Sequence, residues 1–173
     1  MALVVFLKGV NVGGHKTFRP SVLASEMAQL GVMSVGATGT FVVRKPISQA
    51  KLRLEIRRRL SFETEAMICS GSDIVRLVSA EPYAGEPCGP DIVRFVGILA
   101  KRPRVLPALP LNLPPVEEWV VRIVAIRGRF VFGLYRRIMR TIGFLGQLEK
   151  QFGGSITIRN WNTFSRLFEI LKS

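Results

Sequence analysis

Residues 3–31 read LVVFLKGVNVGGHKTFRPSVLASEMAQLG. The first five side chains are apolar and rich in β-branched types, which predicts a buried strand over 3–7. A glycine-bearing loop follows over 9–17, and Pro20 then stands where the first turn of a helix tolerates proline. Apolar residues recur at helical spacing beyond it, and Gly31 is placed to end the helix. The stretch therefore predicts a strand, a loop and a helix.

The residues up to about 80 complete a β-α-β-β-α-β pattern. Short apolar runs predict strands, Ser48 predicts a helix cap, and Thr38-Gly39-Thr40 predicts a hairpin turn. The expected elements are strands at 33–37, 41–44 and 65–70, a helix that Ser48 caps, and a short helix at 73–80 that Ser72 or Asp73 caps. This order is that of the ferredoxin-like plait.

A second set of elements follows three prolines and two glycines in residues 82–90, which predict a linker. The expected elements are strands at 92–100, 119–126, 130–135 and 155–158, and helices at 142–152 and 163–171. Arg127-Gly128-Arg129 predicts a hairpin between the second and third of these strands. The five prolines of 103–115 argue against a regular helix in the crossover.

The fold class expected from this order is α+β. It consists of two ferredoxin-like (β-α-β-β-α-β) plaits packed together, with an extra C-terminal helix. The expected domains are a first unit at 1–81, a linker at 82–90 and a second unit at 91–173. The likeness of the halves rests on element order, since their sequences show no obvious repeat.

The charge is strongly basic: 25 Lys and Arg against 12 Asp and Glu leave a net charge of +13 over 173 residues. Residues 91–140 hold ten bases and three acids, so the excess is largest there. Such a balance favours anionic partners, namely nucleic acid, nucleotides or an acidic membrane surface. The alternative is compositional, because 18 of the 25 bases are arginine.

Several classes of protein are disfavoured. Uncharged stretches are too short or too proline-rich for a spanning helix, and MALVVFL lacks the basic start of a signal peptide. The cysteines, Cys69 and Cys88, form no CxxC pair, and His15 is the one histidine. We therefore expect a cytoplasmic protein with no metal site, no cofactor and no membrane partner, and with oligomeric state open.

The loop after the first strand is the first candidate site. Gly9 to Thr17 is close to the phosphate-binding pattern GxxxxGK[ST], but His15 stands between Gly14 and Lys16 and displaces the lysine. A looser anion nest remains, in which backbone N–H groups of Gly13 and Gly14 point at an anion. Lys8, Lys16 and Arg19 would assist it. The alternative is a tight loop whose glycines permit a positive φ.

The second candidate is Arg159-Asn160-Trp161-Asn162-Thr163, before the last helix. Asn162 or Thr163 is expected to cap that helix, and Trp161 then packs as a hydrophobic staple. The functional alternative is an anion or base-stacking site formed by Arg159, the two amides and the indole at a helix start.

Arg127 to Phe132 partly matches the RNP1 signature of RNA-recognition domains. Phe130 and Phe132 fall on one sheet face, where such a pair either stacks on RNA or joins the core. No catalytic arrangement emerges, since Glu117 and Glu118 would point to opposite faces and no serine or cysteine has a base partner.

LKGVNVGG near the start, Pro82-Tyr83 in the middle and TIRNWNT near the end resemble the bacterial family catalogued as domain of unknown function 1697. The likeness runs over nearly the whole length and implies two packed ferredoxin-like units and no established activity. The family usually has arginine where Lys8 stands, and serine-glycine-asparagine where Thr38-Gly39-Thr40 stands. A site that includes that stretch would be altered here, and 103–115 also diverges.

The leading hypothesis is a non-catalytic binder of an anionic ligand, a nucleotide or nucleic acid. The expected ligand-binding residues are Lys8, Asn11, Gly13, Gly14, Lys16, Arg159, Asn160, Trp161 and Asn162, if the opening loop and the last helix start converge. One alternative is an enzyme acting on a small phosphorylated or other anionic substrate, with His15 or Asn11 in the site. The other is an interaction or oligomerisation module that uses Phe130, Phe132 and Tyr135 on an open sheet face.

Overall fold

The computed structural model of the protein describes residues 2–11, 14 and 16–173. By their contacts the residues form two compact units. Unit 1 comprises Met1–Arg76 and Ser165–Ser173, and unit 2 comprises Leu77–Phe164. The expected domain bounds at 81 and 91 stay a prediction. The contacts group the last nine residues of the chain with the first half.

Unit 1 contains a four-stranded antiparallel sheet with the strand order β2-β3-β1-β4. Its strands are β1 (Leu3–Leu7), β2 (Val32–Val35), β3 (Thr40–Val43) and β4 (Ala66–Ser70). The four expected strands are thereby confirmed to within a residue or two. Alternate side chains of a strand point to opposite faces, so the sheet has two apolar faces where a strand is apolar throughout, as β1 is.

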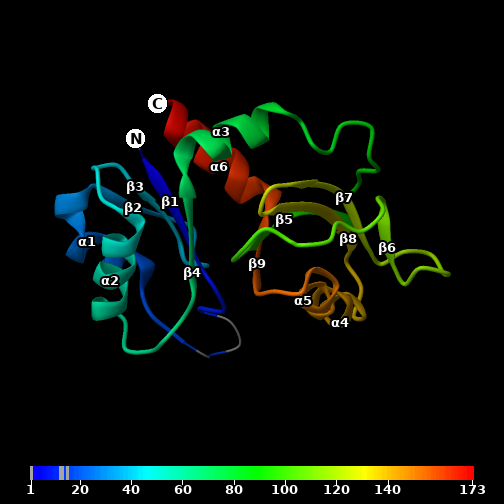
Figure 1. Ribbon diagram of the computed structural model, residues 1–173, viewed down its shortest axis with the longest axis horizontal. Helices are drawn as coiled ribbons and strands as arrows, with labels where there is room; N and C mark the ends of the chain where they lie inside the picture. The colour runs from blue at the N-terminus through cyan, green and yellow to red at the C-terminus, as the bar shows by residue number, and fades with distance from the viewer. Residues whose placement is uncertain (1, 12–13, 15) are drawn as a thin grey trace. The chain divides into compact units, whose positions relative to one another are not determined.

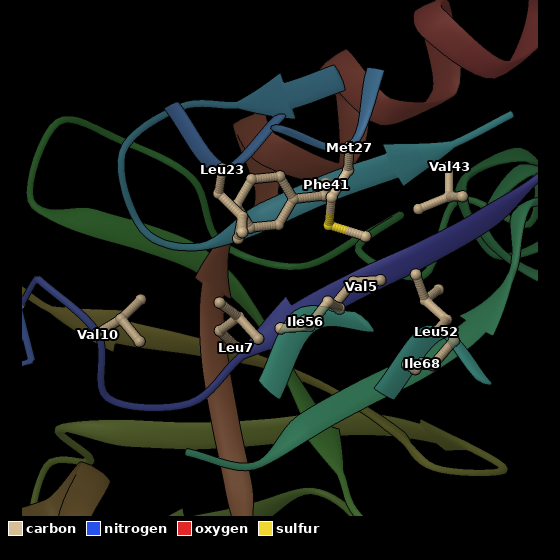
Figure 2. Packing of buried hydrophobic residues seen from close by; sticks show 10 residues of the cluster. All are labelled: Val5, Leu7, Val10, Leu23, Met27, Phe41, Val43, Leu52, Ile56 and Ile68. Carbon is tan, nitrogen blue, oxygen red and sulfur yellow. The ribbon is translucent and has the colours of Figure 1, made fainter. Parts of the chain in front are cut away.

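Helices α1 (Pro20–Glu26) and α2 (Gln49–Arg59) lie on one face of this sheet (Figure 1). Leu23 and Met27 come from the α1 side and Leu52 and Ile56 from α2, and they pack on Phe41 and other strand residues (Figure 2). The Ser48 hydroxyl accepts from the N–H of Lys51 at 3.1 Å, which confirms the expected cap of α2. Gly31, at φ 65°, ends the turn Ala28–Leu30 that follows α1.

Unit 2 contains a five-stranded antiparallel sheet with the order β6-β7-β8-β5-β9. Its strands are β5 (Ile92–Leu99), β6 (Leu111–Leu113), β7 (Val121–Arg127), β8 (Phe130–Arg136) and β9 (Ile156–Asn160). The hairpin between β7 and β8 is confirmed, with Arg127 opposite Phe130. The edge strand β6 was not expected. It pairs over three residues only, and the five prolines around it argue against a strand in the sequence.

One face of the second sheet is covered by α4 (Thr141–Gly146) and α5 (Leu148–Phe152). Leu148 and Phe152 pack there on Phe95 and Ile123. The single helix expected over 142–152 is instead these two short helices, which meet at Gln147. The chain around Gly143 and Gly146 offers little helix propensity.

The remaining helices are α3 (Gly71–Ser79) and α6 (Trp161–Lys172). Both begin two residues before the expected starts. Their caps differ accordingly: the Ser70 hydroxyl accepts from the N–H of Asp73, and the side-chain oxygen of Asn160 accepts from the N–H of Asn162 at 2.8 Å. Asp73 and Asn162 therefore lie inside these helices and do not cap them. The molecule is thus a mixed α and β protein with two antiparallel sheets.

Candidate functional site

The opening loop in unit 1 is tied together by Asn11. Its side-chain N–H₂ donates to the carbonyl of Ala37 at 2.9 Å, and its side-chain oxygen accepts from the N–H of Phe18 at 2.9 Å. Its own N–H donates to the carbonyl of Lys16 at 3.2 Å. Asn11 at φ 54° and Lys16 at φ 48° adopt the left-handed conformation that asparagine tolerates better than most residues. Asn11 therefore acts first as the residue that closes the loop.

The turn between β2 and β3 packs against this loop. A Cβ at Gly39 would lie 2.6 Å from Cγ2 of Val10, and its φ of 84° also favours glycine. The Gly39 carbonyl accepts from the N–H of Leu7 at 2.8 Å. Thr40, the next residue, is fully buried. The turn between β2 and β3 thus supports the opening loop through Gly39.

The other predicted residues of this loop differ in exposure. Gly14 and Lys16 are exposed, and Lys8 is half-buried. The Lys8 backbone joins the loop to the residues before β4, since its N–H donates to the Glu65 carbonyl at 3.0 Å and its carbonyl accepts from the Thr64 hydroxyl. Gly13 and His15 lie outside the described residues. The anion nest at Gly13 and Gly14 consequently stays a prediction.

The string at the β9–α6 junction belongs to unit 2 up to Phe164, so it and the opening loop lie in different units. Arg159 is buried and donates to the Thr157 hydroxyl at 2.7 Å and to the Ile158 carbonyl at 3.0 Å. Burial lowers the pKa of Arg159 to about 10, so the guanidinium is still charged at neutral pH. Asn160 caps α6, and Asn162 is exposed in its first turn.

Trp161 is half-buried and takes part in an aromatic cluster. Its ring centroid lies 5.0 Å from that of Tyr83, 6.1 Å from that of Phe132 and 5.9 Å from that of Phe164. Because Asn160 caps α6, Trp161 is the first residue of the helix and not the residue before the cap, as the expected hydrophobic staple requires. Its ring packs on the three other aromatic rings instead. The nine expected ligand-binding residues remain a prediction as a set.

The aromatic pair on β8 lies within the same cluster. Phe130 packs on Phe164 and Phe132 on Tyr83, and both β8 rings are buried. Stacking of RNA bases requires an exposed ring. Within unit 2, these two side chains therefore serve the core, which was the alternative for the RNP1-like stretch. The same burial removes two of the three aromatic residues that the interaction hypothesis needed.

Tyr83 is the polar member of this cluster. Its hydroxyl donates to the carbonyl of Phe95, and Arg94 lies over its ring with the guanidinium carbon 5.5 Å from the centroid. Burial raises the pKa of Tyr83 well above its usual value, so the phenol is neutral. The residue holds the segment after α3 against the second sheet. It is a structural contact within unit 2.

A basic cluster stands out at the end of the second sheet where β5 stops and β7 turns into β8; we call it the hairpin end. The Leu99 N–H donates to the Arg129 carbonyl at 2.8 Å, and Arg129 donates to the Ala100 carbonyl at 3.4 Å. The Arg102 guanidinium lies beside Gly128, with Nε 3.8 Å from the position of a Cβ there. The members of the basic cluster are Lys101, Arg102, Arg104, Arg127 and Arg129.

The basic cluster differs from other basic residues in its neighbours. Lys101, Arg102, Arg104 and Arg127 are exposed, and none of them forms an ion pair with a residue that the structure describes. The sequence holds no acidic residue between Asp91 and Glu117. Basic residues on two adjoining segments with no acidic neighbour in the sequence raise the local positive potential, which an anion would lower.

Arginines at the opposite end of the same sheet are compensated; we call this the Trp119 end. Trp119 is buried between Arg122 and Arg136, whose guanidinium carbons lie 4.6 and 4.2 Å from its ring centroid. Arg136 pairs with Glu118 at 3.2 Å and donates from Nε to the Trp119 carbonyl at 2.7 Å. Arg122 donates to the Asn112 side chain at 2.8 Å. These arginines hold the fold together.

Helix α2 is a third basic region, in unit 1. Glu55 pairs with Arg59 at 2.6 Å and with Arg58 at 3.3 Å. The hydrogen bond from Arg59 holds the pKa of Glu55 below its usual value. A groove of about 250 Å³ lies beside the end of this helix, lined by Phe18, Arg19, Val22, Leu23, Glu26 and Arg59 with two further residues. Its charges have both signs.

The excess of positive charge is shared between the units. Unit 1 holds 13 bases and 6 acids, and unit 2 holds 12 bases and 6 acids. The excess of bases in 91–140 therefore reflects the order of bases and acids along the chain, and not a difference in net charge between the units. It did not single out the hairpin end, because contact between the loop at 101–104 and the turn at Arg127-Gly128-Arg129 is a tertiary feature.

Neither a metal centre nor a membrane-spanning helix is found among the described residues. Among them, no group of three or more His, Cys, Asp or Glu side chains is arranged to hold a metal ion. No described helix is both long enough and apolar enough to cross a bilayer. Cys69 is buried and Cys88 is exposed, and they form no disulfide with a residue that the structure describes.

Comparison with known proteins supports the fold and a family. The chain is similar to conserved bacterial protein SP0830 from Streptococcus pneumoniae, with a TM-score of 0.64, 17% identity and 98% coverage of each chain. At this identity the likeness concerns the fold alone. No curated protein matches the chain. The family described as "Protein of unknown function (DUF1697)" matches residues 1–106, which is more than half of the sequence, and the chain belongs to this family.

Proposed function

We propose that the protein is a non-catalytic binder of an anionic, phosphate-bearing ligand, and that the basic cluster at the hairpin end is its main contact. The observation that carries the proposal is the convergence of five basic residues from two chain segments. Four of the five are exposed and form no ion pair with a described residue. A folded protein keeps such a concentration of charge at a cost, which a bound anion removes.

The chemistry of the basic cluster suits phosphate. Four of its members are arginines, whose planar guanidinium donates two parallel hydrogen bonds to a phosphate. The Arg102 guanidinium lies beside the turn, with Nε 3.8 Å from the position of a Cβ at Gly128. Contacts of this kind recognise charge and geometry and not a reacting bond, which supports binding rather than catalysis.

We also infer that each unit is a ferredoxin-like plait. In unit 1 the order β2-β3-β1-β4 with all neighbours antiparallel supports this inference. In unit 2 the order β7-β8-β5-β9 repeats it, with β6 added at the edge. Helices α1 and α2 in unit 1, and α4 and α5 in unit 2, then cover one face of each sheet.

The opening loop is a secondary anion contact in this proposal. Gly14 and Lys16 are exposed and both have a positive φ, of 78° and 48°, which is the backbone conformation that anion nests use. Two cysteines that form no disulfide among the described residues are in keeping with a cytoplasmic location. The predicted partners, nucleic acid or a phosphorylated small molecule, supply the phosphate that both contacts need.

The test is binding across a salt series. Fluorescence anisotropy of labelled single-stranded RNA and of labelled inorganic polyphosphate would be measured with nuclease-treated protein. We expect a steep fall of log K with log salt, and we expect Arg102→Gln with Arg127→Gln to make that slope shallower by about 2. The two side chains are exposed, so the variant should fold normally.

A matched control separates the basic cluster from diffuse charge. Lys51→Gln with Arg57→Gln removes the same charge from two exposed positions of α2. We expect this control to change the affinity by less than about threefold, a small part of the salt-dependent contact free energy. Equal losses in the two variants, or no measurable binding of either probe, would refute the proposal.

A further inference from the structure

Exposed aliphatic side chains adjoin the basic cluster. Val105 is 79% exposed, Leu106 is 64% exposed and Leu109 is 42% exposed. Val105 and Leu106 directly follow Arg104, and Leu109 lies three residues further on, in the segment that connects β5 to β6. We call these three residues the aliphatic loop. Exposed apolar groups gathered at one place mark an interaction surface more often than single exposed residues do.

The aliphatic loop is held by prolines. Pro103 and Pro107 are half-buried while the aliphatic side chains beside them are exposed. Because proline fixes φ, the segment loses less conformational entropy when it docks than a flexible loop would. The prolines therefore help to hold these side chains at the surface. The core of unit 2 is formed by other residues.

We propose that the hairpin end docks on the surface of a lipid bilayer that carries anionic phosphate headgroups. This inference rests on the proposed function and names the source of its phosphate. The basic cluster would contact the headgroups while Val105, Leu106 and Leu109 enter the boundary between headgroups and acyl chains. Aliphatic insertion combined with basic residues is the pattern of peripheral membrane contacts.

The composition of the segment favours lipid over nucleic acid. Residues 101–118 contain no Phe, Tyr or Trp, and single-stranded nucleic acid is bound largely by stacking on aromatic rings. An aliphatic side chain gains nothing from a phosphate backbone but gains from removal from water in a bilayer. The absence of acidic residues between Asp91 and Glu117 supplies the charge complementarity.

A second exposed apolar group in unit 2 lacks this complementarity. Met139 is 96% exposed and Ile142 is 80% exposed, at the Trp119 end. There Arg140 pairs with Glu117 at 3.8 Å and Arg136 with Glu118 at 3.2 Å, so two of the local arginines have acidic partners. Met139 and Ile142 therefore provide a control of equal apolar character and different charge.

The contact we propose is peripheral and needs no spanning helix, in line with the helices that the structure describes. It replaces the expectation, drawn from the sequence, that the protein has no membrane partner. The positive charge had already pointed to acidic membrane surfaces as one class of partner. The exposed aliphatic loop is the structural observation that selects this class.

The experiment is sedimentation with vesicles made of equal amounts of phosphatidylcholine and phosphatidylglycerol, with pure phosphatidylcholine vesicles alongside. We expect the wild type to bind the mixed vesicles and to bind the neutral vesicles at least about tenfold more weakly. Val105→Ser with Leu106→Ser should lower binding to the mixed vesicles by about tenfold or more. Arg102→Gln with Arg127→Gln should lower it by about tenfold. Met139→Ser with Ile142→Ser should leave it within about twofold.

A second variant reports insertion directly. In Leu106→Trp, tryptophan emission should shift to shorter wavelength on binding, and brominated phosphatidylcholine should quench it. Emission that stays unshifted and unquenched in bound protein would overturn the inference. The exposure of Leu106 makes this substitution compatible with the fold.

The outcomes separate the inference from the proposed function. RNA or polyphosphate binding that depends on Arg102 and Arg127, without vesicle binding, overturns the lipid inference and leaves the function standing. Full vesicle binding by the Val105 and Leu106 variant also overturns the inference, because attraction is then purely electrostatic. Loss of vesicle binding in the Met139 and Ile142 variant would place the contact at the other end of the sheet and overturn it. Arginine substitutions that alter no binding at all would overturn both.

Discussion

The two ends of the second sheet carry similar numbers of arginines but use them differently. At the Trp119 end, Arg122 and Arg136 lie over one buried indole, and Arg136 also pairs with Glu118. At the hairpin end, Arg102 and Arg127 are exposed and form no ion pair with a described residue. The same residue type is thus part of the fold in one place and open to a ligand in the other.

The difference shows that a count of charges does not locate a binding surface. Both ends contribute to the excess in residues 91–140, and both units carry nearly equal net charge. The two ends differ in the neighbours of each guanidinium. The donors of a buried or paired arginine already bond to groups of the protein, so fewer of them are open to a ligand. Substitutions at the Trp119 end should therefore alter stability, and those at the hairpin end should alter binding.

The largest effect is expected from Trp119→Ala. Removal of a buried indole leaves a cavity and two unsupported guanidiniums, and should lower the free energy of unfolding by about 3–5 kcal/mol. Urea denaturation followed by circular dichroism measures it. Arg127→Ala at the exposed hairpin end should change it by less than about 0.5 kcal/mol. Equal losses in the two variants would mean that the ends are energetically alike.

A smaller loss is expected from Arg136→Gln. The variant removes the Nε donor to the Trp119 carbonyl, the contact with the ring and the pair with Glu118. We expect a loss of about 1–3 kcal/mol in the free energy of unfolding, with RNA binding unchanged. Arg102→Gln is the matched control. It should leave the free energy of unfolding unchanged and lower the affinity for RNA. A fall in RNA affinity for Arg136→Gln would assign the Trp119 end to the ligand surface.

The turn at the hairpin end should respond to backbone strain. Gly128 has φ 59°, and a Cβ there would meet only the Arg102 guanidinium at ordinary contact distance. Gly128→Ala should therefore cost about 1 kcal/mol through its left-handed conformation. Gly128→Asn should cost less, because asparagine tolerates that conformation. Thermal unfolding compares the stability of the variants. An alanine variant as stable as the wild type would contradict a left-handed conformation at Gly128.

The smallest effect is expected from Glu117→Gln. Its pair with Arg140 is 3.8 Å long, and both side chains are more than half exposed. We expect a change below about 0.5 kcal/mol in the free energy of unfolding. The variant also raises the charge of the Trp119 end without touching the hairpin end. A matching rise in vesicle or RNA affinity would show that total charge, and not the basic cluster, controls binding.

Element order was well predicted because local patterns encode it. β1 matched its expected bounds of 3–7, and the Ser48 cap and the hairpin at Gly128 are confirmed. Element ends were less accurate where side chains compete for the same role: Asn160 and not Asn162 caps α6. β6 was missed because a three-residue edge strand between prolines gives no periodic signal.

The candidate sites show the same division. The sequence marked the opening loop and the β9–α6 string as unusual, and the structure gives Asn11, Arg159 and Trp161 contacts within their own units. The residue types predicted the chemistry of these three side chains. They did not predict their burial, because burial depends on elements that are distant in the chain. The charge of 91–140 was readable, yet the sequence does not separate paired arginines from exposed ones.

The sequence by itself determined the order of strands and helices, the basic character and the membership of a family of unknown function, because periodicity, composition and motifs are properties of the chain. The tertiary structure alone decided that Phe130 and Phe132 are core, that Trp161 packs on Phe132 while half-buried, that the Trp119 arginines are compensated, and that Arg102 lies on Gly128. The physical reason is that desolvation and ion pairing depend on which residues meet in space, and those residues are separated by tens of positions along the chain.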